Sequence, residues 1–393
     1  MHETPTRGTL AVIVASATLT VMAGAVLGPV VPGIQDGLGV SESLAGLIIT
    51  THGAFVVLAS PLAGALVDRY GPRRPYVAGL GIYTVGGSAG LLIDSFLPLL
   101  ASRAVLGVGV AFVYTGVTVL IYDLFEGRRM DRALGLRSGA NSVGAAVWPL
   151  VGGALGVVSW QTPFAVYLIG APLGALALAV IPAVERGTAG ASADRSEADR
   201  PAERGTLVIL RHSPALSTVY LLYFGANALL YSIVVFYPQL LGSIGVGSAF
   251  GVGLYLSANG TAGGVSAVLY DRLKRRVGSF ALVGVAFLLW VAAFGLATVV
   301  ETPAGAFAPV VLFGLGIGLV FPSSFAWIES LAPKDRQGQF GSYLAMAGYV
   351  GQFAAPVVFG PFVAPLGVRG VFAAAGATAT IGLSAFVVVG RRR

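Results

Sequence analysis

Twelve long apolar stretches, separated by short charged or turn-forming segments, dominate this sequence. Each is long enough for the about 20 residues that a helix needs to cross ~30 Å of hydrocarbon. They cover residues 9–34, 43–67, 75–95, 97–122, 134–158, 162–184, 214–240, 247–270, 278–300, 305–331, 338–362 and 369–390. The pattern therefore predicts an all-α integral membrane protein with twelve transmembrane helices.

The composition excludes most other classes of protein. Only 10% of the 393 residues are charged and 56% are hydrophobic, whereas soluble domains carry about 25% charged residues. A soluble enzyme, a disordered chain and a nucleic-acid binder are therefore excluded. The chain has no cysteine and three histidines, so we expect no disulfide, no metal site and no cofactor. The first apolar stretch is too long for a signal peptide and is expected to be a retained spanning helix.

The basic residues define the expected topology. Of 24 Lys and Arg residues, 22 lie in alternate connections or at the termini. Arg369 lies in one of the other connections, which carry acids such as Asp36 and Glu301, and Arg103 lies inside a span. The positive-inside rule then places both termini in the cytoplasm. We expect a multi-pass protein of the plasma membrane.

A polar segment divides the chain into two similar halves. Residues 186–212 have mixed charges and no apolar periodicity, which is typical of a flexible cytoplasmic linker, although a regulatory module is an alternative. The segment separates a six-helix bundle at 1–185 from a second at 213–393. Asp68-Arg69 and Asp271-Arg272 recur at equivalent places. Parallel repeats of this kind indicate alternating-access transport, with the site near the midplane between the halves.

The segment GALVDRYGPRR at residues 64–74 is similar to a signature of the major facilitator superfamily. The resemblance covers essentially the whole chain and implies two six-helix bundles that form a transporter. It also implies a cytoplasmic gate, in which Asp68 contacts the start of helix eleven and a following base pairs with an acid at the end of helix four. Pro72 replaces the first arginine of the signature, so Arg73 or Arg74 would take that role. The gate residues are Gly64, Asp68, Arg69, Gly71, Arg73, Arg74 and Asp123. Alternatively, these charges only determine topology.

Two further segments resemble elements of the same superfamily. RAVLGVG at 103–109 is similar to its R-x-x-x-G-x-G element, which implies that Arg103 lines an outer cavity and binds an anionic group or lowers a neighbouring pKa. A snorkelling arginine is the alternative. GAAVWPLVGG at 144–153 resembles an element of drug/proton antiporters, with Trp148 in place of a glycine. Its helix-five kink residues are Gly144, Pro149, Gly152 and Gly153; generic packing of small residues is the alternative.

The middle of the spans contains no Asp or Glu. His52 is the remaining titratable candidate for carrying a proton, and a neutral histidine bonded between helices is the alternative. Amides and aromatic side chains near the middle of spans are candidates for the substrate pathway, together with Arg103 and His52. They are Tyr114, Asn141, Trp148, Asn227, Tyr231, Asn259, Tyr349 and Gln352.

These features favour a secondary transporter of small organic molecules, with proton-coupled efflux as the leading hypothesis. A carrier of a small organic anion, working by symport or facilitated diffusion, is the first alternative. A non-transporting membrane sensor or interaction protein is the alternative of another class. No nucleophile and base stand together as an enzyme would require. The expected partners are a small-molecule substrate, protons and the lipid bilayer, with no nucleic acid, and we expect a monomer.

Overall fold

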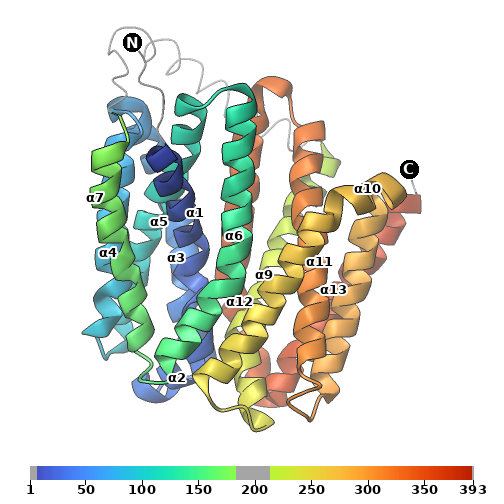
Figure 1. Cartoon of the computed structure of the whole chain (residues 1–393). Helices are drawn as coiled ribbons and strands as arrows, with labels where there is room; N and C mark the ends of the chain where they lie inside the picture. Colours follow the sequence, from blue (N-terminus) through green and yellow to red (C-terminus); the bar gives the residue numbers. More distant parts are fainter. Residues whose placement is uncertain (1–6, 183–212, 392–393) are drawn as a thin grey trace.

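The computed structural model describes residues 7–182 and 213–391, so the predicted linker at 186–212 lies outside the described residues. The described residues form helices and turns, with no strand among them. The first half contains α1 (Arg7–Ala25), α2 (Val31–Leu38), α3 (Glu42–Tyr70), α4 (Arg73–Ser88), α5 (Phe96–Leu124), α6 (Gly127–Gly156) and α7 (Gly170–Val180). The second contains α9 (Pro214–Ser243), α10 (Ala249–Val299), α11 (Phe307–Leu331), α12 (Gln337–Phe359) and α13 (Val363–Arg391). Figure 1 shows the two halves side by side.

Helices overlap each of the twelve predicted spans. By length and apolarity alone, eight stretches qualify as membrane spans, and those at 249–299 and 337–388 each contain two predicted spans. Gly278, with a φ of 79°, breaks α10 between its two predicted spans. The predicted spans at 75–95 and 134–158 are outside the eight, because α4 has only 16 residues and α6 is rich in glycine and polar residues.

The two ends of the bundle differ in charge. We call the end at which α1 begins and α3 ends the basic end, since Arg7, Arg69 and Arg128 lie there; it is the upper end in Figure 1. The opposite end, with Asp36 and Glu42, is the acidic end. The halves meet mainly where α6 packs against α10 and α3 packs against α12.

Candidate functional site

Towards the acidic end, α6 and α10 approach each other backbone to backbone. A Cβ atom added to Gly253 would lie 2.6 Å from the carbonyl oxygen of Pro149, and one on Gly153 would lie 2.6 Å from that of Ala249. The hydroxyl of Ser257 donates a hydrogen bond to the carbonyl of Ala146. Only glycines permit this approach, because any larger side chain would hold the helices apart.

The pair α3 and α12 makes a matching contact. A Cβ atom added to Gly46 of α3 would lie 3.0 Å from the Cβ atom of Pro356 in α12, and one on Gly360, directly after α12, would lie 2.7 Å from that of Ser43. Further towards the middle, a Cβ atom on Gly53 would lie 2.9 Å from the carbonyl oxygen of Tyr349. Both pairs of helices therefore close the acidic end.

Towards the basic end the same faces are open. The antiparallel register of the α3–α12 contacts continues to Gly64, about five turns after Gly46, opposite Gly338. A Cβ atom on either Gly64 or Gly338 would have no described atom of another helix within 4 Å.

The α6–α10 contact extends further, through Gly260 against Ala145 and Gly264 beside Ser142. It ends at Gly139, about one turn before Ser142, where an added Cβ atom would have no described neighbour within 4 Å. The halves thus separate towards the basic end.

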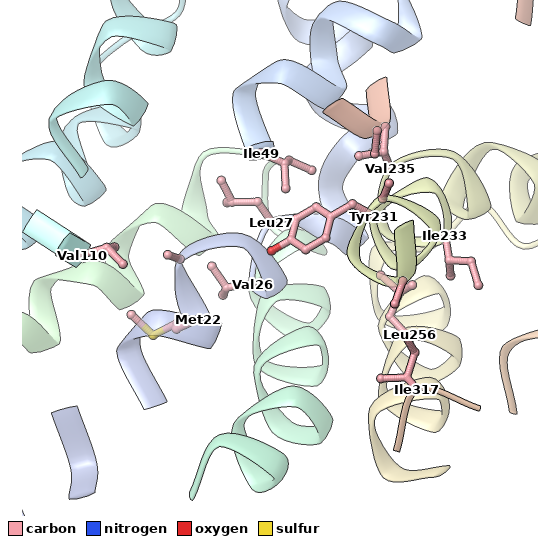
Figure 2. Close-up of a cluster of buried hydrophobic side chains, with 14 of the residues drawn as sticks. Met22, Val26, Leu27, Ile49, Val110, Tyr231, Ile233, Val235, Leu256 and Ile317 are labelled. Carbon is pink, nitrogen blue, oxygen red and sulfur yellow. The ribbon is translucent and has the colours of Figure 1, made fainter. Parts of the chain in front are cut away.

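Tyr231 of α9 lies where the closed part begins. Its ring extends from the second half towards Val26, Leu27 and Ile49 of the first half (Figure 2), and these side chains are buried. A Cβ atom added to Gly24 would lie 3.2 Å from Cε1 of Tyr231. The close approach of Gly24 allows the tyrosine to lie across the junction, and the apolar cluster around it seals the acidic end.

His52 lies beside Tyr231, against the same face of Gly24. A Cβ atom on Gly24 would lie 3.2 Å from Cε1 of His52. The imidazole is 0% exposed; its Nδ1 is 2.6 Å from the carbonyl oxygen of Ile49 and so donates to it. Its Nε2 has no hydrogen-bond partner among the described residues. The Nε2 atom can therefore accept a proton without first breaking a hydrogen bond.

Arg103 lies inside the first half, and its side chain is 0% exposed. Its Nη2 donates to the carbonyl oxygens of Gly86 and Gly87, each at 2.7 Å. The guanidinium lies 5.0 Å from the ring centroids of both Phe164 and Tyr167. In this conformation the side chain does not line an outer cavity as predicted, because residues of α4 and of the 3₁₀ segment at 162–169 enclose it. It also differs from a snorkelling arginine, whose head would be exposed.

The structure brings two of the predicted amides together. Nε2 of Gln352 donates to Oδ1 of Asn227 at 3.2 Å, and Nδ2 of Asn227 donates to the carbonyl of Tyr223 at 2.9 Å. Oε1 of Gln352 is buried without a partner among the described residues. Asn259 instead donates to the carbonyl of Val310 and joins α10 to α11 within the second half.

Two predicted residues of α6 keep unused polar atoms. Oδ1 of Asn141 and Nε1 of Trp148 are buried and have no hydrogen-bond partner among the described residues. The indole lies beside Gly144, whose added Cβ atom would be 3.1 Å from Nε1. Trp148 thus covers the glycine that precedes it by one turn.

Arg137 is a site residue that sequence reasoning missed, because it was counted with the basic connection before α6. Its Nη1 donates to the hydroxyl of Thr118 at 2.9 Å, and its guanidinium lies 4.9 Å from the ring centroid of Tyr114. Tyr349 of the second half lies in the vicinity of Tyr114 and Arg137. The available signal was the position of Arg137, three residues inside the predicted span 134–158.

Residues 13–356 match the model of the Major Facilitator Superfamily. The chain belongs to this superfamily. It is therefore a membrane transporter rather than an enzyme, and its fold is that of the superfamily.

Two curated relatives and one solved structure illustrate what the chain is similar to. Multidrug resistance protein 1 of Bacillus subtilis (strain 168) is 24% identical over 336 residues, which are 84% of each chain. The bacillibactin exporter of the same organism is 30% identical over 143 residues, or 35% of this chain and 36% of the exporter. A mutant of the nucleoside transporter NupG superposes with a TM-score of 0.80 over 97% of this chain and 99% of its own, at 14% identity.

The superfamily's gate signature lies at the basic end. Gly71 has a φ of 75°, which favours glycine, and follows the last residue of α3. Asp68, Arg69 and Arg74 are exposed, as is Asp123 at the end of α5. Arg73 donates from Nη2 to the carbonyl of Leu178 in α7 at 2.5 Å.

The helix-five element of the superfamily contacts both halves. Pro149 lies inside α6, and its carbonyl faces Gly253. An added Cβ atom on Gly152 would overlap the carbonyl of Val26 in the first half, whereas Gly153 faces Ala249 of the second. The two glycines therefore let α6 pack closely on both sides.

Proposed function

We propose that this chain is an exporter that moves small organic molecules out of the cell by alternating access, in exchange for protons. The main support for this proposal is that the two halves are in contact at the acidic end and apart at the basic end. The positive-inside rule assigns the basic end to the cytoplasm, so this conformation opens inward. Substrate can then enter from the cytoplasm. The names of two relatives, a multidrug resistance protein and an exporter, support the outward direction.

His52 is the candidate proton carrier. It lies at the junction that must open when the transporter changes state, since Tyr231 of the second half lies against the same glycine, Gly24. The unpartnered Nε2 supports this role. Separation of the halves would expose the imidazole to the outside, where it could exchange its proton.

The gate signature would close the basic end of the bundle when the acidic end is open. In the outward-open state we expect the basic end to close, with Gly64 meeting Gly338 and Asp68 meeting the start of α12. A carboxylate is stabilised at a helix N-terminus by the unpaired backbone N–H groups and the helix dipole. Asp68 would then stabilise one of the two states, which is what a latch requires.

The test uses energised everted membrane vesicles that contain the protein and a fluorescent reporter of internal acidity. Lipophilic cations, neutral drugs and organic anions are added in turn, and vesicles with the Asp68→Asn variant are the control. We expect at least one compound to dissipate the proton gradient only with the unaltered protein. If substrate moves without any proton flux, antiport is refuted but transport stands. If no compound moves although the protein is folded, a non-transporting sensor is the better description.

A further inference from the structure

Arg137 is a second intramembrane arginine, and its surroundings differ from those of Arg103. It lies about 15 Å along α6 from Gly127, at the open basic side of the junction. Its side chain is partly exposed, whereas that of Arg103 is 0% exposed. A molecule that enters from the basic end can therefore reach Arg137 and cannot reach Arg103.

The charge of Arg137 is not neutralised by the protein. Its partners are the hydroxyl of Thr118 and the ring of Tyr114, both neutral, and no acidic side chain among the described residues pairs with it. Placing a charged side chain inside a membrane costs free energy, so a charge found there is a candidate for binding a ligand or lining its pathway. A guanidinium has five N–H donors in a fork that fits a carboxylate. One hydrogen bond to Thr118 leaves most of that capacity for a ligand.

The second half supplies a complementary surface. The Tyr114 ring of the first half lies 4.9 Å from the guanidinium, and Tyr349 of the second half lies in the vicinity of both Tyr114 and Arg137. Gln352 lies one turn after Tyr349, and its buried Oε1 has no partner among the described residues. The rings suit an aromatic body, and the free oxygen suits a hydroxyl or amine on it.

We propose that the transported substrates are small aromatic organic acids, and that Arg137 binds their anionic group. This inference rests on the proposed export function and specifies its substrate class. The middle of the spans contains no Asp or Glu, so a bound cation would face Arg137 without a counter-charge. An anion neutralises Arg137, and binding it from both halves favours the change of state that exports it.

The experiment compares matched compounds on the purified full-length protein. The probes are 4-hydroxyphenylacetate, 1-naphthylacetate and indole-3-acetate, each beside its methyl ester and its amine analogue. Binding is measured by calorimetry, and flux is measured in proteoliposomes. The variants are Arg137→Gln and Arg137→Lys, with Arg132→Gln as control, because Arg132 is an exposed arginine on the same helix.

We expect the acids to bind and to be transported. Arg137→Gln should weaken acid binding about tenfold or more, as for the loss of a charged hydrogen bond, and should leave ester binding within about twofold. Arg137→Lys should retain part of the affinity, and Arg132→Gln all of it. Acid binding unchanged in Arg137→Gln, or transport of the amines or esters alone, would overturn the anion proposal and leave export standing. No flux of any probe through folded protein would overturn the anion proposal, and the vesicle assay with the broader panel then decides on export separately.

Discussion

The backbone contact between α10 and α6 gives a direct test of alternating access. A Cβ atom on Gly253 would lie 2.6 Å from the carbonyl oxygen of Pro149, whereas ordinary contacts begin at 3.4 Å. The substitution Gly253→Ala must therefore separate the helices by about 0.8 Å, because a backbone carbonyl cannot rotate away, and such overpacking costs about 1–3 kcal/mol. The cost falls on the state with a closed acidic end. We expect the equilibrium to shift towards the opposite state by about 5- to 150-fold.

The assay uses two disulfide pairs, which the chain permits because it contains no cysteine. Ser43→Cys with Gly360→Cys reports closure of the acidic end. A Cβ atom on Gly360 would lie 2.7 Å from that of Ser43, which is closer than the about 3.5–4.5 Å of a relaxed disulfide, so crosslinking rates are compared only among variants that all carry this pair. Gly64→Cys with Gly338→Cys reports closure of the basic end. The ratio of the two crosslinking rates follows the ratio of the two states.

The control for Gly253→Ala is Gly295→Ala in the same helix. A Cβ atom on Gly295 would have no described atom within 4 Å, and the substitution carries the same gain in helix propensity, about 1 kcal/mol. We expect it to leave the ratio of rates unchanged. If Gly253→Ala also leaves that ratio within twofold of the unaltered protein, the closed acidic end is not one of two exchanging states.

Three further substitutions test the roles of single side chains. Arg103→Ala should lower the stability of the purified protein by about 3–5 kcal/mol, since it leaves a large buried cavity, and should not change substrate selectivity; thermal unfolding and competition assays check this. His52→Gln should abolish the pH dependence of transport while the protein still inserts, and a normal pH profile would exclude His52 as the proton carrier. Asp68→Asn should reduce turnover at least about tenfold by removing a charge from the latch, and flux at the wild-type rate would contradict the gate.

The fold could be predicted from the sequence because the bilayer imposes the length of each apolar stretch, and charge marks the connections. The details depend on local chemistry. The predicted span 9–34 is interrupted, since α1 ends at Ala25 and α2 begins at Val31 after a 3₁₀ turn that contains Pro29. Proline lacks the N–H group of a continuing helix. Pro29 is visible in the sequence, but a prediction of spans from apolar length alone does not use it.

The site was less predictable, because it is made by contacts between residues far apart in the chain. Gly24 and Tyr231 meet across the junction, but nothing in the sequence around either residue indicates that the two are in contact. The pairing of Asn227 with Gln352 likewise depends on how α9 and α12 pack. A polar residue in a span indicates that a partner is needed, but only the packing of the helices decides which partner it finds.

The two intramembrane arginines show why a motif does not by itself locate a binding site. Arg103 has a sequence element around it and Arg137 has none, so sequence reasoning favours Arg103. Yet the structure encloses Arg103 between backbone carbonyls and two rings, and it leaves Arg137 partly exposed beside neutral partners. Both guanidinium groups cost free energy because they lie inside the membrane, but a ligand can neutralise only the one that it can reach. Arg103 is enclosed in the first half, where Nη2 donates to two carbonyl oxygens and Nε and Nη1 have no hydrogen-bond partner among the described residues. A ligand cannot reach those atoms in this conformation, whereas an anion entering from the basic end would, on our proposal, neutralise Arg137.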